Sequence, residues 1–281
     1  MKQEHEYTVL LDLFARIVES TKGTALDSNT QFLADTEPLA AKFLLQCGTI
    51  YHLMKGCVLP KILDTEISYF DNQSIIVLVR AVHELYLTFN FIYIAPTTIE
   101  EKRFRHGVWE IGAFLDRQKV RATHEEHIDK LKSEKKILLE LKDAMRGTKF
   151  FRGLEPDRQK KALKGEWRLG YGWVDLSEFA GLDKEQFRQK YRFLSSYAHT
   201  GYLSIFQMAK AAGATDLIQR TEVWIDSVMG IISHFTFDYV KIYPLAAELF
   251  KQYPQAGQLA YINDGIDRKE TDEDSKLRIS S

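Results

Sequence analysis

The sequence predicts an all-α fold, a single helical bundle of six to eight helices. Apolar residues recur every three or four positions through most of the chain, the spacing that places them on one face of a helix. Strict alternation of apolar and polar residues, typical of half-buried strands, is nearly absent. Only six prolines and 16 glycines interrupt the 281 residues, which is few for a β-rich protein. With 45% hydrophobic and 27% charged residues, the composition excludes a disordered, collagen-like or disulfide-scaffold protein.

Three helices are expected before residue 96. Residues 4–20 have an amphipathic pattern. A second helix is expected to begin around Pro38, because proline is tolerated in the first helical turn, and to run to about Val58. Asn72 begins a third helix, which is apolar on nearly every side and ends at Pro96.

The middle of the chain predicts two more long helices and an irregular region. Thr97 and Thr98, each followed three residues later by a glutamate, offer two registers of a capping box for the fourth helix. Thr123 repeats this signal and begins a highly charged helix that extends to about Arg146. Six glycines divide residues 147–182 into short helical pieces.

The C-terminal third is again helical by pattern. Asp183 is placed to cap a helix that reaches His199, where Gly201 either ends the helix or permits it to continue to Ala212. Residues 215–253 predict one or two helices bent at a proline.

We expect residues 1–263 to form one domain and the polar residues 264–281 to form a mobile tail. Two cysteines, Cys47 and Cys57, are ten residues apart, about 15 Å along a helix and too far for a disulfide. Two free thiols, and an N-terminus without a secretion signal, predict a cytoplasmic protein.

The net charge gives no general argument for nucleic-acid binding, and charged residues in the most apolar segment argue against a membrane span. The net charge is −1. Residues 75–95 are long enough to span a bilayer, but Arg80, His83 and Glu84 lie in the middle of this segment, where charged groups are costly. The segment is therefore interpreted as the central helix of a soluble bundle.

The familiar catalytic and metal-binding motifs are not found. The sequence has no GxxxxGK[ST] phosphate loop and no GxSxG elbow. His124 and His127 are three residues apart, whereas a zinc-binding HExxH motif needs a spacing of four. No histidine has a Glu or Asp three positions before it, as the common di-iron helices require. We expect no metal and no cofactor.

The first candidate site is the group of polar residues in the apolar third helix. Arg80 and Glu84 are four residues apart and share a face, and His83 lies beside them. One interpretation is a structural ion pair that fixes helix register, since buried charges must be paired. The other is a polar pocket in which Arg80 binds an anion that Glu84 helps to orient.

The second candidate site is a polar stripe near residue 195. Arg192, Ser195, Ser196 and His199 are spaced i, i+3, i+4 and i+7 and therefore lie on one side of a helix. A cation, two hydroxyls and an imidazole suit phosphate binding with proton transfer. The alternative is a solvated face at a helix C-terminus, where Arg and His are favoured in any case.

Arg192 and His199 form an R-x6-H pair that resembles the R-x(4–6)-H motif of the HEPN superfamily. Members of that superfamily are compact helical bundles, and many are metal-independent ribonucleases of toxin–antitoxin and antiviral defence systems. One departure is that Phe193 follows the arginine, where HEPN ribonucleases usually carry a polar residue. The resemblance covers about residues 72–212 and implies a HEPN-like core with extra helices.

A second resemblance is to a group of uncharacterised bacterial helical proteins. The residues that carry it are Arg80 and Glu84 in an early apolar helix, with Tyr191, Ser195 and His199 late in the chain. We expect Tyr191 to belong to the polar pocket with Arg80, His83 and Glu84.

Two functions follow as hypotheses. In the first, the protein cleaves RNA or binds nucleotides: His199 transfers a proton, Arg192 stabilises the phosphorane, and Ser195 or Ser196 binds a phosphate oxygen. A basic segment between Lys142 and Arg168, with nine Lys or Arg against four Asp or Glu, favours an anionic ligand.

In the second hypothesis the protein is a non-catalytic scaffold or sensor of a bacterial defence system, with a partner protein. Its buried polar residues are then structural. A homodimer is expected in either case, since HEPN-like bundles commonly pair and twofold dimers are common. Tyr171, Trp173 and Tyr202 are the aromatic residues proposed for its interface.

Overall fold

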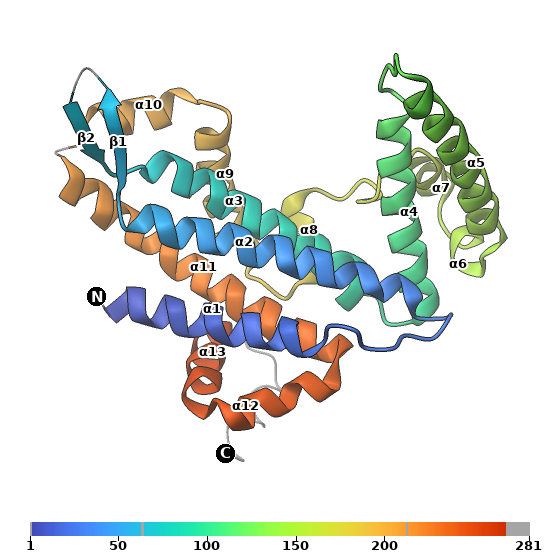
Figure 1. Cartoon of the computed structure of the whole chain (residues 1–281). Coiled ribbons are helices and arrows are strands. Elements are labelled where there is room, and N and C mark those ends of the chain that lie inside the picture. The colour runs from blue at the N-terminus through green and yellow to red at the C-terminus, as the bar shows by residue number, and fades with distance from the viewer. Residues whose placement is uncertain (1, 63–64, 212, 268–281) are drawn as a thin grey trace.

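The computed structural model describes residues 2–62, 65–211 and 213–267, and within them the protein is all-α apart from one small hairpin (Figure 1). The α-helices are α1 Lys2–Ser20, α2 Thr36–Met54, α3 Asn72–Phe89, α4 Ile99–Arg117, α5 Glu125–Gly147, α6 Lys149–Arg152, α7 Pro156–Leu163, α8 Trp173–Phe179, α9 Lys184–Ala198, α10 Tyr202–Ala209, α11 Ala214–Ile242, α12 Glu248–Gln252 and α13 Pro254–Asp267. These thirteen helices exceed the expected number because the glycine-rich region and the chain after Tyr243 divide into short pieces.

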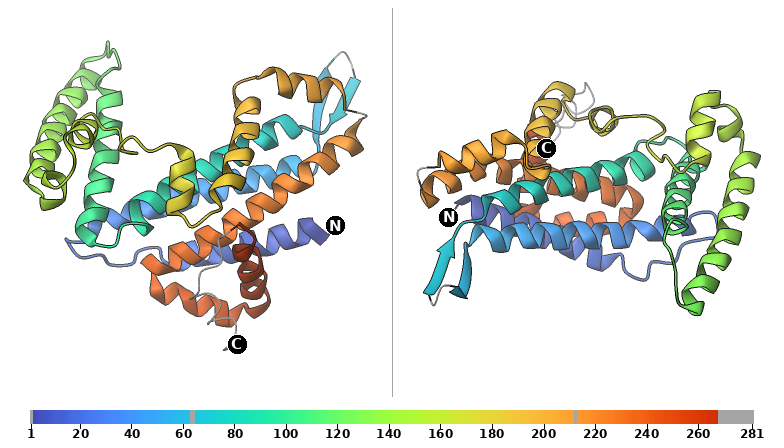
Figure 2. Two further views of the ribbon diagram at one scale, coloured as in Figure 1. Left: turned by 180° about the vertical axis from the view of Figure 1, so that it is seen from behind. Right: turned by 90° about the horizontal axis from the view of Figure 1, so that it is seen from above.

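Helix α3 is the centre of the main core. It packs against α2 on one side, α11 on another and α9 on a third (Figures 1 and 2). Val79, Val82 and Leu87 of α3 are fully buried. A segment of π-helix, Asn90–Ile94, continues α3 toward Pro96. Together these elements form one candidate membrane span by length and composition, but 67% of its most apolar window is buried inside the protein, which is compatible with a soluble chain.

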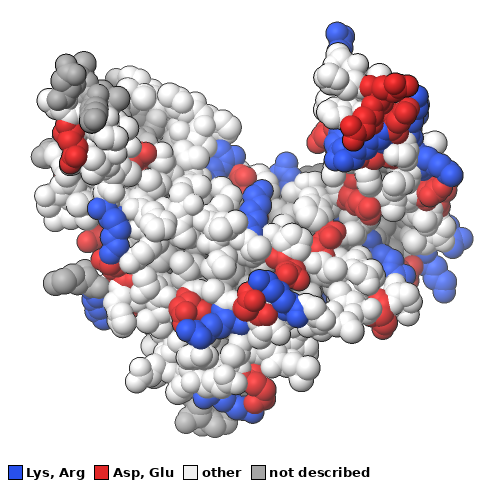
Figure 3. All heavy atoms as spheres, viewed as in Figure 1, with Lys and Arg blue, Asp and Glu red and all other residues white. Residues whose placement is uncertain are grey.

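A second, smaller core lies between α4 and the helices α5–α7. Phe104, Val108 and Ile111 of α4 pack there against Leu138 and Met145 of α5. Figures 1 and 2 show α4 to α7 projecting to one side of the main bundle. In Figure 3 the surface is hollowed between this projection and the part that holds α9 and α10. Trp167 and Tyr171 pack against both cores and connect them.

A β-hairpin, β1 Cys57–Ile62 and β2 Thr65–Tyr69, corrects the expected second helix. We expected that helix to reach about Val58, but α2 ends at Met54 because Gly56, with φ +87°, reverses the chain. Cys57 therefore lies on a strand, and Cys47 is buried in α2. The register of the hairpin shifts between Leu59 and Ile62, on either side of Pro60, which has no N–H to donate.

Most other predicted helix limits agree closely with the structure, but the predicted cap at Thr123 is wrong, because the N-cap of α5 is His124 and its side chain forms no capping hydrogen bond. The Thr98 hydroxyl accepts a hydrogen bond from the Glu101 amide, so the second of the two capping registers is used. The Asp183 carboxylate caps α9 at the Gln186 amide. Helix α13 extends to Asp267, four residues into the expected mobile tail, and the remaining tail residues lie outside the described part of the chain.

Two glycines hold the projecting helices against each other. A Cβ on Gly112 of α4 would be 2.6 Å from the Gly165 carbonyl oxygen, and a Cβ on Gly165 would be 2.4 Å from the Gly112 Cα. Gly165 also has φ +69°, which side chains disfavour.

We predict that Gly165→Ala lowers the free energy of unfolding by about 1–3 kcal/mol, because the added methyl group meets backbone atoms that cannot move independently. Urea denaturation measures this change. Gly147→Ala, at the end of α5 with nothing within 4 Å of the added carbon, is the matched control and is expected to be neutral or stabilising. Equal stability of both variants would contradict the packing described.

Candidate functional site

Four polar side chains from two helices meet at the edge of the main core. Helix α3 supplies Arg80 and Glu84, and the α9 region supplies Tyr191 and His199. The Arg80 Nε donates to Glu84 Oε1 at 2.8 Å, its Nη2 donates to the Tyr191 hydroxyl at 3.0 Å, and its Nη1 is 3.0 Å from His199 Nε2. The Tyr191 hydroxyl donates to Glu84 Oε1 at 2.6 Å. We refer to these four residues as the Arg80 cluster.

Arg80, Glu84 and Tyr191 of the Arg80 cluster are partly buried. The side chains of Arg80 and Glu84 are 16% and 26% exposed. Burial lowers the pKa of Arg80, but the Tyr191 hydroxyl and the Glu84 carboxylate outweigh it, so the net shift is upward. Burial and the hydrogen bond to Glu84 raise the pKa of Tyr191 to about 12. Arg80 is therefore a fixed cation and Tyr191 a fixed donor at neutral pH.

His199 is the exposed member of the Arg80 cluster. Its Nε2 faces an arginine nitrogen, which can only donate, so Nε2 accepts and the ring proton is on Nδ1. Arg80 of α3 thus contacts the C-terminal end of α9 as well as Glu84.

A strained turn positions His199. The residue is the C-cap of α9, where the Gly201 amide donates to Ser196 O at 2.7 Å and the Thr200 amide to Tyr197 O at 3.3 Å, the pattern of a Schellman motif. Thr200 occupies the position usually held by glycine, with φ +53°. A β-branched residue in this conformation costs about 1–2 kcal/mol, which the packing of the turn must offset.

The other predicted stripe residues are near His199 but do not contact it through side chains. Arg192 is exposed, and in the described residues it forms no hydrogen bond or ion pair. Ser195 and Ser196 are half-buried, and the Ser196 hydroxyl lies against Gly201. The arginine that meets His199 is therefore Arg80 from a different helix, which sequence spacing alone could not indicate.

His83 is separated from the Arg80 cluster. It is 2% exposed and faces the core, with Nδ1 2.7 Å from the Val79 carbonyl and Nε2 3.1 Å from the Ser227 hydroxyl of α11. Its role in the described contacts is to connect α3 to α11.

Phe193, the departure from the usual HEPN pattern, has a structural explanation. Its ring stacks on Trp224 of α11, with centroids 4.9 Å apart and planes at 22°. A polar residue here would lose this contact between α9 and α11.

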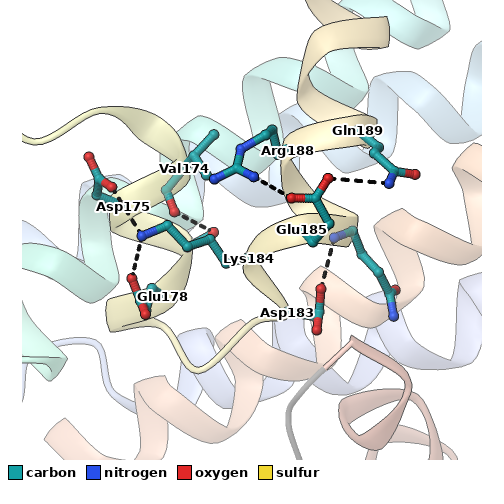
Figure 4. Close-up of polar contacts among 10 residues, drawn as sticks. Val174, Asp175, Glu178, Asp183, Lys184, Glu185, Arg188 and Gln189 are labelled. Carbon is teal, nitrogen blue, oxygen red and sulfur yellow. Dashed lines mark hydrogen bonds and ion pairs between the residues drawn. The ribbon is translucent and has the colours of Figure 1, made fainter.

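Helix α8 is fixed against α9 by charged side chains. Figure 4 shows Lys184 of α9 between two carboxylates of α8: its Nζ is 2.7 Å from Glu178 and 3.4 Å from Asp175. Asp175 also accepts from the Gly172 amide at 2.9 Å, which lowers its pKa. These contacts place Trp173, the first residue of α8, beside Tyr191, with ring centroids 6.5 Å apart.

The fold and the Arg80 cluster define an all-α protein with a half-buried Arg–Glu–Tyr group that ends in an exposed histidine. In the described residues, no group of three or more His, Cys, Asp or Glu is arranged to hold a metal ion.

The chain belongs to a family of unknown function, DUF5677, whose model matches residues 62–215. That range begins at the end of β1 and includes α3 to α10, so it contains all of the Arg80 cluster. Searches of curated proteins and of solved structures each found no match. The predicted resemblance to an uncharacterised helical family is confirmed.

We predict that Glu84→Ala lowers the free energy of unfolding by about 1–3 kcal/mol, because it leaves Arg80 and Tyr191 without their shared acceptor. Glu84→Gln keeps an oxygen acceptor and is expected to cost less. Urea denaturation compares the two variants.

The control for this comparison is Glu185→Ala, which removes an exposed ion pair with Arg188 and is expected to change stability little. If Glu84→Ala were as mild as Glu185→Ala, the Arg80 cluster would not be the stabilising group described here.

Proposed function

We propose that the protein is a metal-independent RNA-cleaving enzyme whose reacting groups are His199 and Arg80. The observation that supports this most is the contact between the exposed His199 Nε2 and Arg80 Nη1 at 3.0 Å. It pairs an exposed imidazole with an arginine that Glu84 and Tyr191 hold in place. Acid–base catalysis on a phosphodiester needs this combination of a proton acceptor and a fixed cation.

The proposed reaction is attack of a ribose 2′-oxygen on the neighbouring phosphorus. His199 Nε2 takes the 2′-hydroxyl proton as the bond from O2′ to phosphorus forms. Arg80 Nη1, released from Nε2, donates to a non-bridging phosphate oxygen, where negative charge develops. The bond from phosphorus to O5′ then breaks, and O5′ takes the proton from His199. The products are a 2′,3′-cyclic phosphate and a 5′-hydroxyl, with no redox change.

Arg192, Ser195 and Ser196 have supporting roles in this proposal. Arg192 is exposed one residue from Tyr191 and attracts the phosphate backbone, while the two serines are close enough along α9 to bind a phosphate oxygen. Cleavage in a cytoplasmic bacterial defence or toxin system is the setting that the HEPN resemblance suggests.

We predict that the purified protein cleaves single-stranded RNA in EDTA and that His199→Ala reduces the rate by at least about 100-fold, the usual contribution of a general base. Gel analysis of a labelled RNA measures this. Arg80→Lys is expected to be nearly as defective, because a lysine cannot hold Glu84, Tyr191 and phosphate together. Arg192→Lys is expected to cleave RNA faster than Arg80→Lys, because an exposed arginine that only contacts phosphate can be replaced by lysine with a smaller loss.

The control is His127→Ala on α5, which removes a histidine outside the Arg80 cluster. Unchanged cleavage by His199→Ala, or no cleavage by the wild type, would contradict the proposal.

A second function, a non-catalytic scaffold that pairs with another copy of itself, is favoured by one other observation. Five of the eight residues of α10 are large, apolar and 44–81% exposed, namely Tyr202, Leu203, Ile205, Phe206 and Met208. With about 150–250 Å² for each large side chain, they expose roughly 500 Å². That is a substantial part of the roughly 800 Å² that each partner buries in a stable dimer.

We predict a homodimer of twice the 32.5 kDa chain mass, in which α10 packs against α10 of the second copy. Of the three aromatic residues first considered for this interface, Tyr202 is 81% exposed, whereas Tyr171 and Trp173 are half-buried in the protein's own core. Light scattering at micromolar concentration measures the mass. Phe206→Asp is expected to give monomers, and Leu245→Asp, at an exposed position on another element, is the control. A monomeric wild type would exclude the dimer.

A further inference from the structure

Cationic and aromatic side chains form a series of contacts that leads to His199. The series begins with Arg168 in the loop after α7, continues through Trp173 of α8 and Tyr191 of α9, and ends at Arg80 and His199. We refer to these five residues as the stacking strip. They come from four separate parts of the chain, so the series is a product of the tertiary structure.

Consecutive members of the stacking strip are in contact. The Arg168 guanidinium carbon is 4.9 Å from the centre of the Trp173 ring. The Trp173 and Tyr191 rings are 6.5 Å apart, and the Arg80 guanidinium carbon is 5.1 Å from the Tyr191 ring. The last step is the 3.0 Å contact from Arg80 to His199.

The two ends of the stacking strip coincide with backbone strain. In the described residues, the non-glycine residues with positive φ are Leu169 and Thr200, each at +53°. Leu169 directly follows Arg168, and Thr200 directly follows His199. Strained residues persist only where the surrounding structure over-determines them, so both ends of the stacking strip lie beside constrained backbone.

The charged side chains at the stacking strip and around it leave a small positive excess. Of the nearby acids, Glu84 is bonded to Arg80 and Tyr191, and Asp175 and Glu178 are paired with Lys184 (Figure 4). Arg192 is exposed beside Tyr191, and Lys164 and Glu166 are exposed before Arg168. Arg168 is also the last residue of the basic segment Lys142–Arg168, so positive charge continues from the stacking strip into the projecting helices.

We propose that the stacking strip is a binding site for single-stranded RNA and delivers the strand to His199, an inference that rests on the proposed cleavage function. Arginine guanidinium groups and aromatic rings together bind phosphates and stack unpaired bases, whatever the base. A duplex does not fit this chemistry, because its bases already stack on each other.

The test measures binding without cleavage. The probe is a fluorescent ten-nucleotide RNA with every 2′-hydroxyl methylated, which cannot react by the proposed route, and fluorescence anisotropy gives Kd. Arg168→Gln and Trp173→Leu are each expected to raise Kd roughly tenfold. Binding is also expected to quench tryptophan fluorescence in the wild type, and less so in Trp173→Leu. Circular dichroism verifies that both variants are folded.

Two substitutions of matched type serve as controls. Arg16→Gln on α1 and Tyr261→Leu on α13 remove an exposed arginine and an exposed tyrosine outside the stacking strip, and both are expected to leave Kd unchanged. A blunt duplex of the same sequence is expected to bind at least tenfold more weakly than the single strand.

The outcomes separate this inference from the proposed function. Strip-dependent binding of the methylated probe, with no cleavage of ordinary RNA, would support the stacking strip and remove the enzyme proposal. Cleavage of ordinary RNA, with a Kd that neither Arg168→Gln nor Trp173→Leu alters, would overturn the stacking strip alone. If Trp173→Leu fails to fold, Arg168→Gln decides the result by itself. A wild type that does not bind the probe, or prefers the duplex, also overturns the inference.

Discussion

The burial of α3 is the constraint on which the rest of the structure depends. A helix that is apolar on nearly every side can remain in water only if other helices cover it, and α2, α9 and α11 do so. Full burial of Val79, Val82, Leu87 and their neighbours stabilises the fold by about 1.5–3 kcal/mol for each large side chain. Because α2, α9 and α11 come from opposite ends of the chain, covering α3 brings N- and C-terminal segments together.

The Arg80 cluster follows from the same constraint. A charged residue on a covered helix must find partners or reach water, and Arg80 does both, since its side chain is 16% exposed and has three polar contacts. Helix α9 can cover this side of α3 only because Tyr191 accepts from Arg80 and donates to Glu84. The contacts of Glu84 and Tyr191 therefore stabilise the packing of α9 on α3 and also hold Arg80 next to the exposed His199. The structural and the functional interpretation of these residues do not exclude each other.

The region around His199 combines a rigid support with an accessible end. Phe193 stacks on Trp224, and Lys184 joins α9 to α8, so the helix that carries Tyr191 is fixed on two sides. His199 itself lies outside the helix, in a turn whose Thr200 adopts a conformation that glycine would adopt without strain. Leu169 has the same conformation near the other end of the aromatic line. At these two positions the tertiary structure imposes a positive φ that leucine and threonine disfavour.

The sequence by itself determined the all-α class and most helix limits, and it singled out Arg80 and Glu84 for one candidate site and His199 for another. Those predictions depend on local spacing, capping residues and the cost of burying charge, all of which can be evaluated along a single segment. The tertiary structure alone decided that Arg80 faces His199, that His83 turns to Ser227, and that Arg168 and Trp173 extend the line toward the basic segment. It also decided that α2 ends at Met54 and gives way to a hairpin after Gly56. These features depend on which side chains approach from other helices, and residue spacing within one helix contains no information about its neighbours.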